Sequence, residues 1–158
     1  MSERADRPNR WPWPPLIYSA AIVLALLLTA VQRLPWFGAP LKDILFIVGV
    51  LMMIGAVALD LYAMFTLNAA KTTIWPNRGS DHFTAAGPYR FTRNPIYVGN
   101  TALMIGTGLA FGMVWFIGLA FVAAWLTQKL AILREEIHLE TRFGKHYRDY
   151  KKKVRRWI

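Results

Sequence analysis

The stretch from Asn94 to Gln128 contains 35 residues without one charged side chain. A straight α-helix of that length would measure about 52 Å at 1.5 Å per residue, whereas the hydrocarbon core of a bilayer is roughly 30 Å thick. We therefore expect two shorter helices that form a hairpin, with the bend near Phe111 and Gly112. The sequence predicts that both helices of this hairpin cross a membrane.

Two further apolar segments precede the hairpin. Residues 16–33 predict a first span and residues 44–67 a second one, which is long enough to cross the bilayer with some tilt. Asp60 is the only charged residue in the second segment. Because an acid inside a span is costly, we expect Asp60 to face protein or water. A hydrophobic content of 55% and a mean hydropathy of +0.29 agree with a membrane protein.

The distribution of basic residues predicts the topology. With four spans, 17 of the 19 lysines and arginines lie on one side and only Arg33 and Lys42 on the other. With three spans the split becomes 7 to 12. Because basic residues accumulate on the cytoplasmic side, we predict an all-α integral membrane protein with four transmembrane helices and both termini cytoplasmic. A bacterial inner membrane is the expected location.

The whole chain, residues 1–158, reads as a single domain. After the hairpin we expect the last helix to continue into the cytoplasm, to end at Phe143 and Gly144, and to be followed by an amphipathic helix from His146 to Ile158 that lies against the membrane face. The predicted parts are a flexible arm (1–15), spans at 16–33, 44–67, 95–111 and 113–133, a cytoplasmic loop (68–94) and a helical tail (134–158).

The junction between the loop and the third span has the features of an anion site. Arg90 and Arg93 lie just before a predicted helix start, Asn94 is a favourable N-cap residue, and Pro95 suits the first helical position. The N-terminus of a helix attracts anions through its free N–H groups and its dipole. The alternative is an ordinary boundary loop whose arginines reach the lipid headgroups.

Two other short motifs could meet this junction. In Gly106-Thr107-Gly108, glycine permits the close approach of a ligand or of another helix. Close packing of two helices through small residues is the simpler explanation of these glycines. Glu135 and Glu136 point about 100° apart on a helix, so one could face a pocket while the other faces water or pairs with Arg134.

Several classes of function are disfavoured. The chain has no cysteine, and His82, His138 and His146 show no metal-ligand spacing, so we expect no metal. The net charge of +10 is explained by topology, and no nucleic-acid motif accompanies it. There is no serine–histidine–acid arrangement, phosphate loop or transporter repeat. An enzyme that acts at the membrane interface is the better class.

Four segments together resemble the isoprenylcysteine carboxyl methyltransferase family: residues 87–99, 106–108, 135–136 and 143–154. The related phospholipid N-methyltransferases share the Gly-x-Gly element and the acidic pair. The likeness extends over about residues 68–158. It implies an integral membrane enzyme that uses S-adenosylmethionine, with a cofactor pocket closed by the helical hairpin and the tail.

The resemblance also implies site residues. Arg93 and Lys153 are the expected catalytic residues. Asn94 stands where eukaryotic members have histidine, and Lys153 stands where they have arginine. The expected cofactor-binding residues are Tyr89, Arg90, Arg93, Asn94, Pro95, Tyr97, Gly99, Gly106, Thr107, Gly108, Glu135, Glu136 and Tyr147.

The identity of the methyl acceptor stays open in the sequence. We expect a lipophilic small molecule or lipid that reaches the site from the bilayer, most simply the carboxylate or thiol of an isoprenoid-like compound, because an anionic acceptor needs no general base. A phospholipid amine is the alternative acceptor. Two further alternatives are a reductase with a nicotinamide cofactor, by analogy with membrane sterol reductases, and a non-enzymatic membrane scaffold.

Overall fold

The computed structural model describes residues 12–70 and 84–158, which are almost entirely helical. The predicted arm up to residue 11, and loop residues 71–83 with His82, lie outside this part. The helices are α1 (Trp13–Val31), α2 (Leu41–Ala69), the short 3₁₀ helix η1 (Gly87–Arg90), α3 (Pro95–Phe111), α4 (Val114–Thr127), the π-helical segment η2 (Gln128–Ile132) and α5 (Leu133–Lys153).

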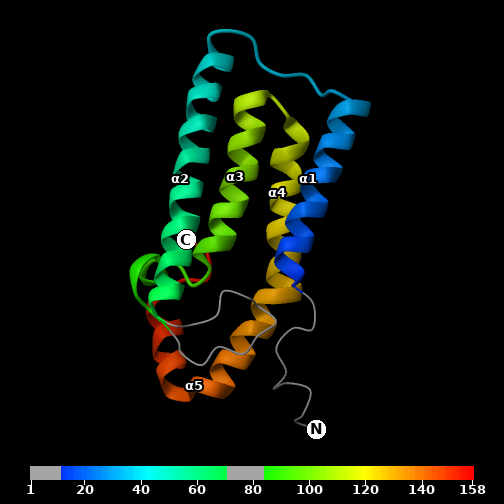
Figure 1. Cartoon of the computed structure of the whole chain (residues 1–158). Coiled ribbons are helices and arrows are strands. Elements are labelled where there is room, and N and C mark those ends of the chain that lie inside the picture. Colours follow the sequence, from blue (N-terminus) through cyan, green and yellow to red (C-terminus); the bar gives the residue numbers. More distant parts are fainter. Residues whose placement is uncertain (1–11, 71–83) are drawn as a thin grey trace.

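The helices α1 to α4 lie side by side along one direction (Figure 1). Helix α3 lies between α2 and α4, and α1 packs mainly against α4. Through η2, helix α4 continues into α5, which bends at one end of the bundle. We call this end, formed by η1, the start of α3, α5 and residues 154–158, the polar end.

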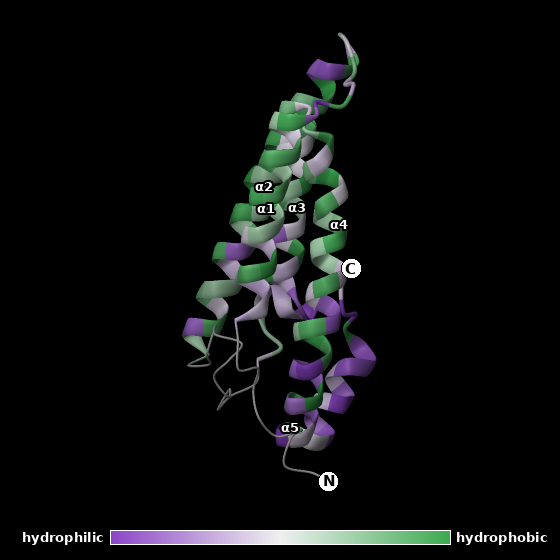
Figure 2. Cartoon of the chain, turned by 90° about the vertical axis from the view of Figure 1, so that its right-hand side faces the viewer, coloured by the Kyte–Doolittle hydropathy of each residue, from purple (hydrophilic) through white to green (hydrophobic). Residues whose placement is uncertain are grey.

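Within the described segments, three helices are long and apolar enough to cross a membrane: α1, α2 and the continuous helix from Val114 to Lys153. Helix α3 is shorter, with 17 residues. Large apolar side chains on α2 point outward, such as Leu51 (62% exposed) and Phe65 (67%). Hydrophobic residues dominate α1 to α4, whereas α5 is mostly hydrophilic (Figure 2). Such an apolar exterior is that of an integral membrane protein.

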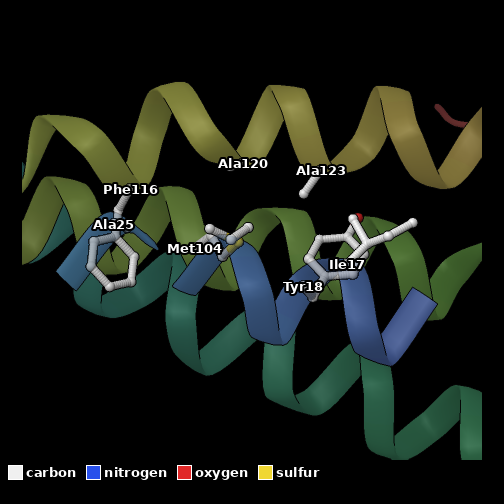
Figure 3. Packing of buried hydrophobic residues seen from close by; sticks show 8 residues of the cluster. Ile17, Tyr18, Ala25, Met104, Phe116, Ala120 and Ala123 are labelled. Carbon is white, nitrogen blue, oxygen red and sulfur yellow. The ribbon is translucent and has the colours of Figure 1, made fainter. Parts of the chain in front are cut away.

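Small residues bring α1 and α4 together. Ala25 of α1 and Ala120 of α4 are fully buried, and their short side chains allow the two helices to approach closely. Larger side chains fill the remaining space, among them Tyr18, Met104 and Phe116 (Figure 3). This core contains residues of α1, α3 and α4 and holds the start of α3 next to α4.

Glycines bring α2 and α3 together even more closely. A Cβ atom at Gly49 would lie 2.5 Å from the backbone nitrogen of Ala110 and 2.6 Å from the carbonyl oxygen of Gly106. A Cβ atom at Gly106 would lie 2.8 Å from the carbonyl oxygen of Gly49. Gly106 therefore packs closely against another helix, which was the simpler of the two explanations for this glycine.

A tight turn separates α3 from α4. Helix α3 ends at Phe111, and Gly112 adopts the left-handed conformation, with φ of 69°. A Cβ atom there would lie 2.8 Å from Cδ1 of Trp36. A larger residue would therefore be strained both by its backbone conformation and by this ring.

The second half of the tail differs from the prediction. Gly144 has non-helical angles (φ 52°, ψ −122°) and kinks α5, and the helix then ends at Lys153 instead of continuing to Ile158. Residues 154–158, which we call the strap, leave the helix in an extended conformation at Val154 (φ −117°, ψ 131°). Tyr147 and Tyr150, two of the apolar residues expected to lie on the membrane, are instead buried against the protein, whereas Ile158 is 85% exposed.

We predict that Gly106→Ala destabilises the fold by about 1–3 kcal/mol, because an added methyl group would meet the backbone of α2 and cannot be relieved by a side-chain rotation. Gly55→Ala is the matched control, since nothing lies within 4 Å of a Cβ atom at that position of α2. Alanine there is expected to be neutral or stabilising, given its better helix propensity. Thermal unfolding of both variants in detergent is the measurement. Equal midpoints for the two variants would contradict the close approach of α2 and α3.

Candidate functional site

The polar end is centred on the buried carboxylate of Glu136, which is 6% exposed. Arg156 binds it with two hydrogen bonds, from Nε to Oε1 and from Nη2 to Oε2, both of 2.8 Å. This two-point geometry is the strongest way in which arginine binds a carboxylate. The hydrogen bonds to Glu136 raise the pKa of Arg156, so the guanidinium stays charged.

Arg93 approaches the same carboxylate from the start of α3. Its Nη1 atom lies 3.0 Å from Oε1 of Glu136, and the side chain is 10% exposed. The direction of the N–H bond does not meet hydrogen-bond geometry, so we interpret this contact as an attraction between charges. The Arg93 side chain also donates a hydrogen bond to the hydroxyl of Tyr147. We call Arg93, Glu136 and Arg156 the arginine–glutamate cluster.

The strap runs alongside the residues that precede α3. Thr92 and Arg155 form an isolated parallel bridge, and the backbone N–H of Arg93 donates to the carbonyl oxygen of Arg155 (2.9 Å). The carbonyl oxygen of Arg156 accepts from the Thr92 hydroxyl (3.1 Å) and from Nδ2 of Asn94 (2.9 Å). The strap therefore holds the start of α3 through both backbone and side-chain groups.

These contacts correct the predicted role of Asn94. Helix α3 begins at Pro95 as predicted, but the Asn94 side chain makes no capping hydrogen bond. Its amide donates to the strap, and the N–H of Asn94 itself donates to the hydroxyl of Thr92 (3.2 Å). A carbonyl acceptor on the strap is available to the amide group, so the side chain turns outward from the helix.

Aromatic residues close the sides of the polar end. The hydroxyl of Tyr150 donates to the carbonyl oxygen of Tyr89 (2.6 Å) and so connects α5 with η1. The indole N–H of Trp157 donates to Oε1 of Gln128 in η2 (2.7 Å). Burial raises the pKa of Tyr89, so its hydroxyl stays protonated at neutral pH. Tyr147, which is 2% exposed, fills the space between α5 and Arg93.

Both members of the acidic pair contact residues of the polar end. Glu136 meets the arginines, and the carboxylate of Glu135 accepts a hydrogen bond from the Tyr97 hydroxyl. The π-helical segment η2 directly precedes the pair. A π turn inserts an extra residue into the helical register and is common near functional sites. The extra residue rotates the following helix relative to α4, and both acids turn with it.

Asp60 brings another acid close to this region. Its carboxylate packs directly on Gly99, where a Cβ atom would lie 2.5 Å from Cγ of Asp60. Among the residues that the structure describes, Oδ1 of Asp60 has no hydrogen-bond partner, although it is buried. Gly99 thus provides the space that the carboxylate of α2 occupies. Asp60 faces protein, as the sequence predicted for an acid inside a span.

The structure brings together only part of the predicted site. Six predicted residues belong to the arginine–glutamate cluster or lie near it and Glu135, but Arg90 and Lys153 are exposed. Residues 106–108 lie about 16–20 Å from Pro95 along α3, at 1.5 Å per residue. A Cβ atom at Gly108 would meet Ile117 of α4, and the Thr107 hydroxyl donates within its own helix. Their expected cofactor contacts, and the roles of Arg90 and Lys153, stay predictions. The six residues at or near the cluster are Tyr89, Arg93, Asn94, Pro95, Tyr97 and Tyr147.

Sequence reasoning missed Arg156, the cation that binds Glu136 most closely. It lies in the basic run Lys151–Arg156, which is broken only by Val154, and no spacing distinguishes it from its neighbours. Gln128 and Trp157 were missed for a similar reason, because they are 29 positions apart and meet only in the folded chain. For Asp60 the signal was present, since it is the only charge in its apolar segment.

The donor groups at the polar end fit an organic ligand. Outside the undescribed ranges 1–11 and 71–83, no group of three or more histidine, cysteine and acidic side chains is arranged to hold a metal ion. Carboxylates can bind amino and hydroxyl groups, a guanidinium can bind a carboxylate, and tyrosine rings can cover an apolar or cationic group. Nε of Arg93 is buried without a hydrogen-bond partner among the described residues and is thus available to a ligand.

Comparison with known proteins gives the family. A protein from Haemophilus influenzae described as uncharacterized is 41% identical over 54 residues, which cover 29% of this chain and 86% of that protein. The family model for phospholipid methyltransferases matches residues 44–146. This match contains α3, α4, the acidic pair and Arg93, and it extends over well more than half of the 158 residues. The chain therefore belongs to the phospholipid methyltransferase family.

Proposed function

We propose that this protein is an S-adenosylmethionine-dependent methyltransferase that transfers a methyl group to a lipophilic acceptor from the bilayer. The observation that carries the proposal is the buried site at the start of α3, where acids, arginines and tyrosines meet in a chain of this family. We further propose that α3 is a fourth span and that both termini are cytoplasmic, most simply in a bacterial inner membrane. The 17-to-2 division of basic residues supports this topology.

The side chains of the polar end match the groups of the cofactor. Glu135, held by Tyr97, is suited to the α-amino group or the ribose hydroxyls. Arg93 and the free N–H groups at the start of α3 are suited to the carboxylate. The rings of Tyr89 and Tyr147 can cover the remaining surface and exclude water. When bound, the cofactor supplies an electrophilic methyl group.

Positioning accounts for most of the acceleration in this proposal. Methyl transfer is an in-line displacement, so the protein contributes by aligning the two reactants and by excluding water. The buried arginine–glutamate cluster fixes the start of α3, and the tyrosines of η1 and α5 enclose it. An acceptor can reach this region from the lipid between the helices, whose outer surfaces are apolar.

The charge of the site favours an amine acceptor over an anionic one. Glu135, Glu136 and Asp60 contribute three carboxyl groups, against the two guanidinium groups of Arg93 and Arg156, and burial raises the pKa of Glu135 to about 7, so this acid can take up a proton near neutral pH. Both oxygens of Glu136 are already bound by the two arginines and Glu135 is assigned to the cofactor, which leaves Asp60 to act on an approaching headgroup. A protonated amine is attracted by these acids, and its nitrogen must lose a proton before it can form a bond to carbon. A carboxylate or thiolate would be repelled.

We therefore propose a phospholipid amine as the acceptor, in line with the family's description. The carboxylate or thiol of an isoprenoid-like compound, expected from the sequence, stays the second candidate. It is favoured by the resemblance of residues 87–99 and 143–154, and it needs no proton acceptor. The two candidate acceptors differ in charge, because an amine headgroup is cationic and a carboxylate or thiolate is anionic.

Calorimetry on the detergent-purified protein should detect saturable binding of S-adenosylmethionine. Glu135→Gln is expected to weaken binding by about 10–100-fold, the loss typical of one charge-assisted hydrogen bond. Asp149→Asn, an exposed acid on the same helix, is the matched control and should bind like the wild type. The nicotinamide cofactor serves as the control ligand. Binding of neither ligand by folded protein would refute the methyltransferase, and binding of the nicotinamide alone would favour the reductase.

An acceptor screen with radiolabelled cofactor distinguishes the two candidate acceptors. We expect label in vesicles that contain phosphatidylethanolamine and not in an S-prenylated cysteine derivative. Asp60→Asn keeps the shape of the side chain but removes its charge, so it should lower transfer to the amine by about tenfold or more. Label in the prenylated compound alone, or full activity of Asp60→Asn, would contradict the amine proposal.

A further inference from the structure

The two glutamates of the acidic pair differ in how much of their binding capacity is already used. Oε1 of Glu136 contacts Nε of Arg156 and Nη1 of Arg93, and Oε2 contacts Nη2 of Arg156. The side chain of Glu136 is 8% exposed. A carboxylate with both oxygens bound by guanidinium groups and almost no free surface has little capacity for a ligand. Glu135, by contrast, accepts a hydrogen bond from an uncharged donor, the hydroxyl of Tyr97.

Arg156 connects three separate parts of the polar end. Its guanidinium binds Glu136 of α5, while its carbonyl oxygen accepts from Thr92 and Asn94 before α3. The next residue, Trp157, binds Gln128 of η2. The strap therefore has no helical hydrogen bonds of its own after Val154 and depends on these contacts for its position.

We propose that Glu136 and Arg156 form a latch that fixes the strap against the start of α3, and that Glu136 is a positioning residue. Within the proposed function, on which this half of the inference rests, Glu135 is then the acid that contacts the cofactor. The latch also sets the orientation of Arg93, whose guanidinium lies on the same carboxylate oxygen. Arg156, and not Lys153, is the basic residue of the tail that acts at the site.

Another ion pair of the tail provides a matched comparison. Nζ of Lys151 lies 2.8 Å from Oε2 of Glu140, as close as Arg156 lies to Glu136. The side chains of that pair are 33% and 36% exposed, so water can replace the contact when it is lost. In the latch pair the carboxylate of Glu136 is buried (8% exposed) although Arg156 is 31% exposed, so water has little access to the acid, and removing Arg156 leaves only Arg93 to compensate its charge. Variants of the two ion pairs can therefore be compared to distinguish the effect of a latch from that of an ordinary surface ion pair.

Hydrogen–deuterium exchange on the full chain without ligand tests the latch independently of methyl transfer. The amide of Arg93 donates to Arg155 of the strap and should be protected in the wild type. In Arg156→Gln and in Glu136→Gln we expect this amide to exchange at least about tenfold faster, because the strap opens locally. Glu140→Gln should leave it unchanged, and amides of α2 should stay protected in every variant, which shows that the bundle is folded.

If Arg156→Gln or Glu136→Gln also exposes the amides of α2, the milder variant Arg156→Lys decides, since it keeps the charge and loses the two-point geometry. Faster exchange at Arg93 alone in this variant supports the latch. Unchanged protection of the Arg93 amide in a folded Arg156 variant would overturn it.

A double-mutant cycle with S-adenosylmethionine tests the division between the two acids. We expect Glu136→Gln and Arg156→Gln to weaken binding by similar factors, and the double variant to be no weaker than either single one, since both remove the same latch. Glu135→Gln should add its full loss to that of Arg156→Gln. A much larger loss for Glu136→Gln than for Arg156→Gln would make Glu136 a direct ligand and overturn the assignment. If the wild type binds no cofactor, the proposed function fails while the exchange experiment still decides the latch.

Discussion

A carboxylate buried between two guanidinium groups determines the arrangement of the polar end. An ionised side chain loses its hydration when it leaves water, and the loss is compensated only by close partners of opposite charge with good geometry. Glu136 obtains these partners from Arg93, which precedes α3, and from Arg156 of the strap. Removal of one partner from such a buried pair typically costs about 3–5 kcal/mol. The start of α3, α5 and the strap must therefore come together for the polar end to form.

The helix bundle positions the elements that form the polar end. Inside a membrane there is little hydrophobic driving force between helices, so association depends on close packing and on interhelical hydrogen bonds. Gly49 and Gly106 provide close packing between α2 and α3, and Ala25 and Ala120 provide it between α1 and α4. The hydroxyl of Tyr18 adds a hydrogen bond from α1 to the carbonyl oxygen of Tyr97 (3.2 Å). Helix α3 is thus held on both sides, which fixes the position of its first turn.

The location of the site fits an enzyme that brings a polar cofactor and a lipid together. The charged residues of α5 and the strap lie at one end of the helices, and apolar side chains cover their outer surfaces (Figure 2). A polar reactant can be held at this boundary, and a lipidic reactant can approach along the helices. Asp60 extends the acidic character of the site into the apolar part, where an unpaired charge is costly and usually has a function.

The sequence alone determined the features that depend on local chemistry. Apolar length identified a helical membrane protein, and the proline at position 95 marked the start of α3, because these signals depend on the residues themselves. The motifs also identified Arg93, Tyr97 and the acidic pair as neighbours in one site. Only the tertiary structure showed that Arg156 binds Glu136, that the amide of Asn94 turns to the strap, and that the strap is extended. These contacts join residues that are far apart in the chain: Glu136 and Arg156 are 20 positions apart, and Asn94 and Arg156 are 62 positions apart. A local sequence pattern does not specify which of these distant groups become neighbours in the folded chain.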